Sequence, residues 1–498
     1  SPDQWAQFVE YCRRDVEVER EIRKRLSAYP LPEIEARVWA ADQRINDRGI
    51  RVDLDLAARA IECDELSRAE LLEEAERVTG LANPNSPAQL KAWIEARTGK
   101  AIKSLDKAAA GELIRTTNDP AIRRALELRL QLGKSSVAKY QAIERSACPD
   151  GRARGLMQYY GAARTGRWGG RRIQPQNLPR TRLRDLDAAR NLVLAGDYES
   201  IDLLFGDTAS TLSELVRTAL IASPGCQLIS ADFSAIEARV LAWLAGEEWV
   251  LEVFRRGEGI YEATAAQMYR VPLDSIHRGH PLRERGKLAT LACGYSGGVN
   301  ALIAMGSLRS GLEERELQPI VDQWRKANPR IVQYWRDVEA AALSAIAGRP
   351  VELAHGVRFF REGDALETPL PSGRARAYLR PEIEPDPRFG KDSITFAGID
   401  EKNRWGRVRT YGGKLVENIT QAVARDCLAE AILRVEEKFH EAKIVLHVHD
   451  EIVADVPLSI PTDSAIERIV GLMAAPMPWA PELPLDADAF ATPYYRAD

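Results

Sequence analysis

Two apolar strand patterns that each end in carboxylates constrain this sequence most strongly. The apolar segment Gln227–Asp232 predicts a buried strand with a carboxylate at its C-terminal end, followed by a helix. Residues 443–456 alternate in polarity and predict a β-hairpin whose tip holds His449, Asp450 and Glu451. Ionised carboxylates beside apolar strands lose hydration and repel each other, so a bound cation would stabilise them. We therefore expect the strand ends to lie side by side, with Asp232 and Asp450 sharing two Mg²⁺ ions.

The same residues also allow plainer interpretations. Asp232 could simply cap the helix that follows it. His447 and His449 share one strand face and could belong to a metal site. No third histidine or cysteine is near them in sequence, so packed histidines are the favoured interpretation.

A third segment, 283–298, combines cations with apolar and aromatic residues at helical spacing. Arg283, Lys287, Leu291 and Tyr295 recur every four residues and would form one stripe along a helix. Such a stripe could hold a triphosphate at its cationic end and a base or sugar at its aromatic end. The alternative is a surface helix whose long cationic side chains cover apolar neighbours.

The overall charge and its local distribution point in opposite directions. The 498 residues suggest about three domains, and 69 Lys+Arg against 73 Asp+Glu give a formal net charge of −4. That balance alone argues against nucleic-acid binding. Residues 151–184, however, contain nine arginines and no acidic residue, which predicts a local basic track for phosphates.

Cysteine spacing and apolar runs bound the cellular setting. The six cysteines form no C-x-x-C pair, so neither a disulfide framework nor a cysteine zinc site is predicted. No apolar run reaches the roughly 18 residues of a membrane span. We therefore expect a cytoplasmic protein with no membrane partner.

The three chemistry-bearing segments resemble, in order and spacing, motifs A, B and C of the family A DNA polymerases, the DNA polymerase I type. Upstream, Thr165-Gly166-Arg167 and Gln176-Asn177-Leu178-Pro179 are similar to the family's TGR and QN-[LI]-P elements. Asn418 and Gln421 resemble the asparagine and glutamine of its element before motif C. The segment 291–298 is most similar to phage and prophage members.

The resemblance implies an α+β fold of the right-hand type, with an antiparallel palm sheet and helical fingers and thumb. The implied divisions are an exonuclease-like remnant at 1–30, a thumb at 31–155, a palm at 156–239 and 346–498, and fingers at 240–345. The implied activity is template-directed, primer-dependent DNA synthesis, in which the primer 3′-hydroxyl attacks the α-phosphate of a dNTP. Two metal ions with arginine and lysine would supply the charge neutralisation that this reaction needs.

The resemblance also implies roles for individual residues. Asp232, Asp450 and the Phe233 carbonyl would hold two Mg²⁺ ions, which Mn²⁺ can replace, while Glu451 would be an accessory catalytic carboxylate. Lys287 would protonate the departing pyrophosphate, and Glu237 would be the steric gate against a ribose 2′-hydroxyl. The implied nucleotide-binding residues are Arg283, Lys287, Leu291, Tyr295, Glu237 and Tyr261. The implied DNA-binding residues are Arg164, Arg167, Gln176, Asn177, Asn418, Gln421 and His449.

Two nucleotide-binding positions depart from the family pattern. Leu291 stands where phenylalanine is common, and Tyr261 stands where many members have a histidine that contacts the triphosphate. A phenol can hydrogen-bond but is normally uncharged at neutral pH. We therefore expect both positions to affect nucleotide selection.

The N-terminal segment carries a separate signal. Tyr11-Cys-Arg-Arg-Asp15 resembles the third motif of the 3′–5′ proofreading exonuclease. The other carboxylates of that site would lie upstream of it. We therefore expect residues 1–30 to be the remnant of an exonuclease-like domain and this chain to lack proofreading.

Other functional classes stay open from the residues alone. A single-subunit RNA polymerase or a reverse transcriptase would use similar chemistry, although Glu237 as a gate argues against the RNA polymerase. A catalytically silent DNA-binding factor would have to retain unpaired carboxylates at a structural site, which is unfavourable. The expected partners are primer-template DNA and dNTPs, for a monomer that accessory replication factors can join. The expected setting is a bacterial or phage-infected host cytoplasm.

Overall fold

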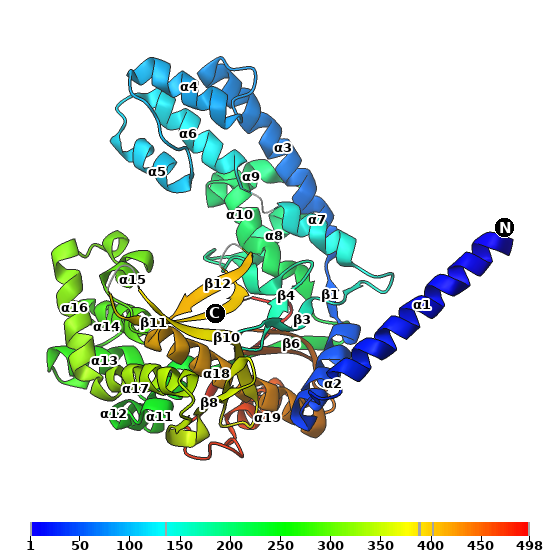
Figure 1. The fold of residues 1–498 in the computed structure, drawn as a ribbon. Coiled ribbons are helices and arrows are strands. Elements are labelled where there is room, and N and C mark those ends of the chain that lie inside the picture. The colour runs from blue at the N-terminus through cyan, green and yellow to red at the C-terminus, as the bar shows by residue number, and fades with distance from the viewer. Residues whose placement is uncertain (1, 135–136, 387–389, 401–402, 497–498) are drawn as a thin grey trace.

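Helices and antiparallel sheets make up the fold in the computed structural model, which describes residues 2–134, 137–386, 390–400 and 403–496. Every strand pair in this part of the chain is antiparallel. Figure 1 shows a group of helices rising from a broader body, with the first helix projecting away from both. Separate helical regions beside antiparallel sheets are what the predicted α+β class requires.

A four-stranded sheet carries the strands that the sequence predicts. Its order is β13-β14-β6-β15. The strands are β6 (Cys226–Phe233), β13 (Lys443–Val448), β14 (Glu451–Pro457) and β15 (Ala487–Thr492). β13 and β14 form the predicted hairpin, in which His449 has a φ of 55° and lets the chain reverse without a glycine. Two helices, α18 (Gly412–Lys438) and α19 (Thr462–Ala474), pack beside this sheet.

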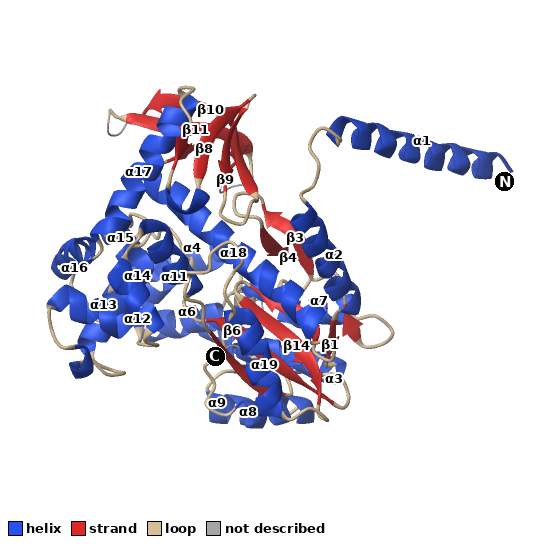
Figure 2. Ribbon diagram, turned by 90° about the horizontal axis from the view of Figure 1, so that it is seen from below, coloured by secondary structure: helices blue, strands red, loops and turns tan. Residues whose placement is uncertain are grey.

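Glycine, proline and β-branched or aromatic residues are frequent at 350–411 and predict short strands and loops, and the described residues of this region form a second sheet. Its order is β12-β11-β10-β9-β8-β7. The strands are β7 (Val351–Glu352), β8 (Arg358–Glu362), β9 (Ala365–Pro369), β10 (Ala375–Pro385), β11 (Asp392–Ile399) and β12 (Trp405–Thr410). Figure 2 shows this sheet apart from the first one, with α18 between them.

The chain between β6 and the second sheet is helical, as predicted. The helices are α11 (Ile236–Ala245), α12 (Glu248–Arg255), α13 (Ile260–Tyr269), α14 (Pro281–Cys293), α15 (Val299–Ala304), α16 (Glu314–Ala327) and α17 (Pro329–Ile346). α13, α14 and α16 pack on one another, while α11 and α17 pack on α18. Among the described helices, none combines the length and apolar composition that a membrane span requires.

The N-terminal part begins with an isolated helix and then enters the body. α1 (Pro2–Leu26) has no buried residue, whereas α2 (Glu33–Arg48) packs against α18. Two small sheets follow, and their strands are β1 (Ile50–Val52), β2 (Arg152–Ala153) and β5 (Leu220–Ile221), then β3 (Met157–Ala162) and β4 (Arg167–Gly170).

The rising helical group has a small core of its own at its tip. Its helices are α3 (Leu54–Thr79), α4 (Pro87–Thr98), α5 (Lys107–Thr116), α6 (Pro120–Leu132), α7 (Val137–Ser146), α8 (Leu186–Ala195), α9 (Tyr198–Phe205) and α10 (Thr208–Leu215). The tip core consists of Leu90, Ile94, Leu105, Ala110, Ile122, Ala125 and Leu126. Ser86 caps α4, because its hydroxyl accepts from the Gln89 N–H at 3.5 Å.

One helix boundary in this group differs from the prediction. A single pattern over 121–145 predicts one helix, but α6 ends at Leu132 and α7 begins at Val137. Gly133 follows the last residue of α6, and glycine is a poor helix former. Short 3-10 helices elsewhere are η1 (Pro175–Asn177), η2 (Val216–Ala219), η3 (Leu273–Ser275), η4 (Leu308–Ser310) and η5 (Ala354–Gly356).

A buried ion pair joins α2 to α18. Arg425 donates to both carboxylate oxygens of Glu35, at 2.6 and 3.0 Å, and the two side chains are 1% and 6% exposed. Trp168 covers the guanidinium at 4.7 Å. Burial raises the pKa of Glu35, but the hydrogen bond and charge of Arg425, the hydrogen bond of Tyr159 and the charge of Arg374 together outweigh burial, so the pKa lies below its ordinary value. The pair therefore fixes the N-terminal part to the long helix of the body.

We expect Glu35→Gln to lower the free energy of unfolding by about 3 kcal/mol, because it removes a carboxylate from a buried guanidinium. The measurement is urea denaturation followed by far-UV circular dichroism. The matched control is Glu437→Gln, whose partner Arg37 is at 2.6 Å but is 50% exposed. The control should change stability by less than about 0.5 kcal/mol. Equal effects of the two substitutions would contradict the importance assigned to burial.

Candidate functional site

The end of the four-stranded sheet brings three acidic residues into one row. Asp232 of β6 lies directly opposite Glu451 of β14 on one side and Asp488 of β15 on the other. Directly opposed residues of antiparallel strands share one sheet face, with Cβ atoms about 5 Å apart. The Phe233 N–H donates to the Asp450 carbonyl at 3.2 Å, which holds the hairpin turn beside the end of β6. Asp450 thus lies at the same end of the sheet as the row of Glu451, Asp232 and Asp488.

A cavity of about 590 Å³ opens at this end of the sheet. Seven residues chosen from the sequence line it, namely Arg167, Gln176, Asp232, Glu237, His449, Asp450 and Glu451. The space is therefore polar on most sides and faces the carboxylate row. It is large enough for several waters or part of a charged ligand.

Two hydroxyl groups hold the Glu451 carboxylate. Tyr495 donates to Oε2 at 2.8 Å, and the Ser230 hydroxyl donates to Oε1. Burial raises the pKa of Glu451, and these two hydrogen bonds oppose the rise. Arg217 donates to the Tyr495 hydroxyl at 2.7 Å, so the tyrosine links Glu451 to a buried cation.

Asp232 and Asp450 are more weakly stabilised as anions. Loss of hydration, followed by the charges of Asp450 and Glu451, raises the pKa of Asp232 to about 7. Burial raises the pKa of Asp450 to about 6, against the opposing charge of Arg167. Asp450 Oδ1 lies 3.5 Å from Arg167 Nη2 and accepts no hydrogen bond within the described part of the chain. Both carboxylates therefore favour a nearby cation.

Arg167 connects the carboxylates to the helical region. Its Nη2 donates to Glu237 Oε1 at 2.6 Å, and Tyr295 donates to the other oxygen of Glu237 at 2.6 Å. Asp450, Arg167, Glu237 and Tyr295 thus form one series of contacts from the hairpin turn between β13 and β14 to the turn after α14. The Arg167 Nε is buried and has no hydrogen-bond partner among the described residues.

The donor atoms at the strand ends suit a hard divalent cation. No group of three or more acidic, histidine or cysteine side chains in the described residues is arranged to hold a metal ion. Because hydroxyls occupy Glu451, the donors at the strand ends are the carboxylates of Asp232 and Asp450 and the Phe233 carbonyl. Mg²⁺ commonly binds through one or two carboxylates and keeps several waters. The residues therefore fit the Mg²⁺ that the sequence predicts.

The predicted nucleotide-binding cations, Arg283 and Lys287, lie on α14, next to Tyr261 on α13. Arg283 pairs with Glu262 and lies 5.6 Å from the Tyr261 ring, so these residues form one group. No carboxylate in the described ranges forms an ion pair with Lys287. Leu291 is 47% exposed on the same helix. The helix therefore presents one paired cation, one lysine and one apolar side chain along its length.

The predicted stripe is wrong at its last member. Arg283, Lys287 and Leu291 lie on α14, but Tyr295 lies in the turn after the helix, which ends at Cys293. Glycines at 294, 297 and 298 weaken the helix there. Tyr295 consequently points to Glu237 rather than continuing the helix face.

The predicted DNA-binding residues are only partly gathered. Gln176 and His449 line the cavity beside the carboxylates. Asn418 is buried in α18 and donates to the Tyr378 hydroxyl at 3.4 Å, and Gln421 lies one turn along the same helix. Arg164 donates to the Ile399 carbonyl at 2.6 Å. These last three residues do not line the carboxylate cavity.

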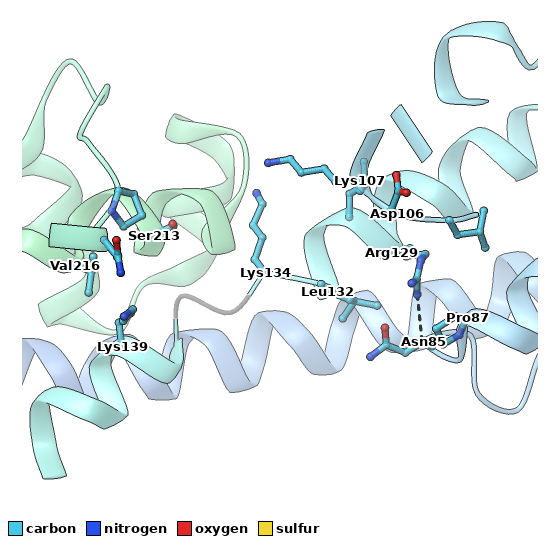
Figure 3. Close-up of a pocket in the computed structure, with 15 residues that line it drawn as sticks. Asn85, Pro87, Asp106, Lys107, Arg129, Leu132, Lys134, Lys139, Ser213 and Val216 are labelled. Carbon is cyan, nitrogen blue, oxygen red and sulfur yellow. Dashed lines mark hydrogen bonds between the residues drawn. The ribbon is translucent and has the colours of Figure 1, made fainter. Parts of the chain in front are cut away.

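Asn177 lies at a second, larger cavity between the helical group and the body. This cavity of about 810 Å³ is lined by the cations Lys107, Arg129, Lys134 and Lys139. Figure 3 shows Lys107 and Lys134 extending into the gap, and Arg129 donates to the Asn85 carbonyl at 3.2 Å. Lys134 also pairs with Asp207 at 2.9 Å. The cavity is thus predominantly positive and separate from the carboxylates.

The arginine-rich segment serves two purposes. Arg152 and Arg154 donate to backbone carbonyls of residues 47–49 and pair with Asp455 and Asp150, respectively. These two side chains therefore stabilise the fold. Five others are exposed and could reach phosphates, namely Arg171, Arg172, Arg180, Arg182 and Arg184.

Four site residues escaped the sequence reasoning. Ser230, Arg217 and Tyr495 contact Glu451 directly or through one another, and only tertiary structure brings them together. Asp488 could have been found, since it lies in an acidic and apolar alternation at 486–490 that is typical of a strand.

Comparisons with known sequences agree with one another. Residues 61–495 match the sequence profile described as DNA polymerase family A. The chain is 53% identical over 498 residues to a DNA polymerase of Bacillus phage SP02, which covers 100% of this chain and 76% of the phage protein. It is 27% identical over 246 residues to DNA polymerase I of Pseudomonas aeruginosa, covering 48% of this chain and 22% of that protein.

A solved structure has a similar fold. It is the POL domain of Pol1 from M. smegmatis in complex with DNA primer-template and dNTP. The TM-score is 0.66 at 19% sequence identity, over 96% of this chain and 74% of the other. This similarity confirms the predicted fold class.

We expect Mg²⁺ binding to release about one proton per protein at pH 6.5 and almost none at pH 8.5. A raised carboxyl pKa means that Asp232 and Asp450 hold protons at the lower pH, and the metal displaces them. Isothermal titration calorimetry in buffers of different ionisation enthalpy measures the release. Asp232→Asn with Asp450→Asn should abolish it, whereas Asp463→Asn on the exposed start of α19 should not. Equal release at both pH values would contradict the electrostatics of the site.

Proposed function

Because the chain belongs to the family A DNA polymerases, we propose that its carboxylate site adds deoxynucleotides to the 3′ end of a primer paired with a template strand. The chain is accordingly a DNA-directed DNA polymerase. The observation that carries the site assignment is the row Glu451, Asp232 and Asp488 beside Asp450, facing a polar cavity. The row concentrates negative charge where a nucleotidyl transfer needs bound cations.

The other classes considered are not favoured. A single-subunit RNA polymerase or reverse transcriptase does not fit a family profile that spans residues 61–495. A silent DNA-binding factor would not require two carboxylates with raised pKa at one cavity.

The spatial groups support a right-hand division of the chain. The proposed thumb, 31–155, contains α3 to α7 of the helical group, with the separate core at its tip, whereas α8 to α10 of that group fall within the proposed palm range. The proposed fingers, 240–345, contain α12 to α16 and most of α11 and α17, and the proposed palm, 156–239 with 346–498, contains the four-stranded sheet. The proposed exonuclease-like segment, 1–30, contains α1, which is exposed along its whole length.

The carboxylates would position the reacting groups. When bound, two Mg²⁺ ions would supply charge neutralisation and activation of the primer 3′-hydroxyl. Asp232 and Asp450, with the Phe233 carbonyl, are the proposed ligands. Glu451, held by Ser230 and Tyr495, would add negative charge beside them without having to bind an ion itself.

Residues of α13 and α14 would hold the dNTP. Arg283 and Lys287 are positive and would bind the triphosphate, and Lys287 could transfer a proton to the departing pyrophosphate. Tyr261, beside Arg283, could donate a hydrogen bond to a phosphate oxygen. Leu291 would pack against the sugar or base.

Glu237 and Tyr295 would read the sugar and the template base. Their hydrogen bond fixes the Glu237 carboxylate between Tyr295 and Arg167. A carboxylate held in this way would occupy the space of a ribose 2′-hydroxyl. Because Tyr295 and Arg167 hold the Glu237 carboxylate from two sides, it would exclude the 2′-hydroxyl effectively.

The primer-template would contact both cavities. Arg167, His449 and Gln176 line the carboxylate cavity, where they would face the primer-template. The cations of the second cavity and the exposed arginines of 171–184 would bind backbone phosphates. Asn418, Gln421, Asn177 and Arg164 are proposed to support or contact the DNA when it is bound.

We expect Asp450→Ala to reduce single-nucleotide primer extension by at least about 10³-fold, because several kcal/mol of transition-state stabilisation is lost. Rapid-quench extension of a labelled primer with Mg²⁺ measures the rate. Asp463→Ala, on an exposed helix start, is the matched control and should retain the parent rate. An Asp450→Ala rate within tenfold of the parent would refute the metal-site assignment.

We expect Glu237→Ala to lower the preference for dNTP over rNTP by about 10- to 200-fold, since the excluded volume and the rigid carboxylate are both removed. The measurement is the ratio of kcat/KM for matched dATP and ATP opposite thymine. An unchanged ratio, with extension by dATP intact, would show that another residue excludes the 2′-hydroxyl.

A further inference from the structure

Three buried arginines bind three consecutive backbone carbonyls just before Arg167. Arg376 Nε donates to the Arg164 carbonyl at 2.7 Å. Arg374 Nη2 donates to the Thr165 carbonyl at 3.0 Å, and Arg425 Nε donates to the Gly166 carbonyl at 3.1 Å. Their exposures are 5%, 3% and 2% in that order. We call these three residues the arginine clamp.

Each member of the arginine clamp has a further anchoring contact, and Asp426 contacts both Arg374 and Arg425, the latter at 3.3 Å. Arg425 pairs with Glu35 on α2, and Arg374 pairs with Asp426 on α18 at 2.8 Å. Arg376 donates to the Tyr378 hydroxyl at 2.6 Å. The buried charges of Arg425 and Arg374 are therefore paired, as burial requires. The clamp consequently connects the turn at residues 164–166 to α2, β10 and α18.

The clamped turn is closely packed. Gly166 has a φ of 76°, and a Cβ atom there would lie 2.6 Å from Arg374 Nη1 and 2.9 Å from the Tyr160 ring. Tyr160 in turn accepts from Arg374 Nη1 at 2.9 Å. The turn therefore requires glycine at this point for both conformation and space.

The residue that follows this turn contacts the catalytic centre. Arg167 donates to Glu237 at 2.6 Å and approaches Asp450 at 3.5 Å. None of the three clamp residues lines the carboxylate cavity. The clamp therefore lacks direct access to this cavity, and the turn that leads to Arg167 is the part of the chain that all three clamp residues hold.

We propose that Arg374, Arg376 and Arg425 are positioning residues that set the placement of Arg167 between Asp450 and Glu237. The inference rests on the proposed function, because it assigns Arg167 a place in primer extension. Three directional hydrogen bonds restrict the turn in a way that packing alone does not. Arginine suits this task, since its planar guanidinium presents several donors in a fixed geometry, whereas a lysine ammonium does not.

The test is a double-mutant cycle on primer extension. Arg376→Lys and Arg425→Lys are each made in the parent and in the Arg167→Ala chain. Because a shift of about 1 Å in a positioned group can reduce rate substantially, we expect each lysine variant to lose about tenfold in kcat/KM in the parent. In the Arg167→Ala chain the same substitutions should cost less than about twofold, since the residue through which they act is already absent.

The matched control is Arg434→Lys. Arg434 is also buried in α18 and donates to the carbonyls of Ala475 and Pro476, but these lie away from the turn. It should change kcat/KM by less than about twofold in either background. Thermal unfolding of every variant reports folding, and Arg376→Lys carries the test if Arg425→Lys does not fold.

Two results would overturn the inference. One is an equal loss in the parent and Arg167→Ala backgrounds, which would make the clamp a purely structural feature. The other is no loss in folded Arg376→Lys. A second double-mutant cycle uses primer-template affinity, measured by fluorescence anisotropy without dNTP. If the lysine variants weaken binding less in the Arg167→Ala chain than in the parent, the proposal is supported. If the effects of the lysine variants and of Arg167→Ala are additive, the proposal is refuted. A parent chain that binds DNA but cannot extend a primer would refute the proposed function, while the anisotropy cycle would still decide on the clamp.

Discussion

The register of three antiparallel strands places like charges opposite one another at a single sheet end. Asp232 faces Glu451 and Asp488, and the hairpin turn adds Asp450 beside them. Like charges in directly opposed positions destabilise a sheet unless something neutralises them. Hydrogen bonds from Ser230 and Tyr495 stabilise the Glu451 carboxylate against the pKa rise that burial causes, while the pKa of Asp232 is raised to about 7 and that of Asp450 to about 6. Asp232 and Asp450 therefore favour a bound cation.

Arg167 extends this electrostatic arrangement into the helical region. Through Glu237 and Tyr295 it connects the carboxylates to the turn after α14, so the metal site and the proposed sugar gate share one contact chain. The arginine clamp holds the other side of Arg167. The local excess of arginine also explains how a chain of net charge −4 suits DNA, because positive side chains concentrate where phosphates would lie.

The sequence predicts the strands that carry the site, but it does not predict the side-chain contacts that support the site. The strand Gln227–Asp232 and the hairpin at 443–456 follow from polarity patterns, and both are observed. The four-residue spacing predicts Tyr295 on the same helix as Leu291, but this spacing takes no account of the glycines at which α14 ends. The contacts of Tyr495 with Glu451 and of Arg425 with Glu35 join positions 44 and 390 residues apart. Local patterns carry no information about such pairs, since only the tertiary fold brings them together.

The most direct test of the central claim counts divalent ions at the carboxylate row. Electron paramagnetic resonance can measure Mn²⁺ bound to the chain with a dNTP and a primer that lacks its 3′-hydroxyl. Two Mn²⁺ ions per protein should bind, and Asp232→Asn or Asp450→Asn should remove at least one of them. The same number of bound ions in the parent and both variants would contradict the account.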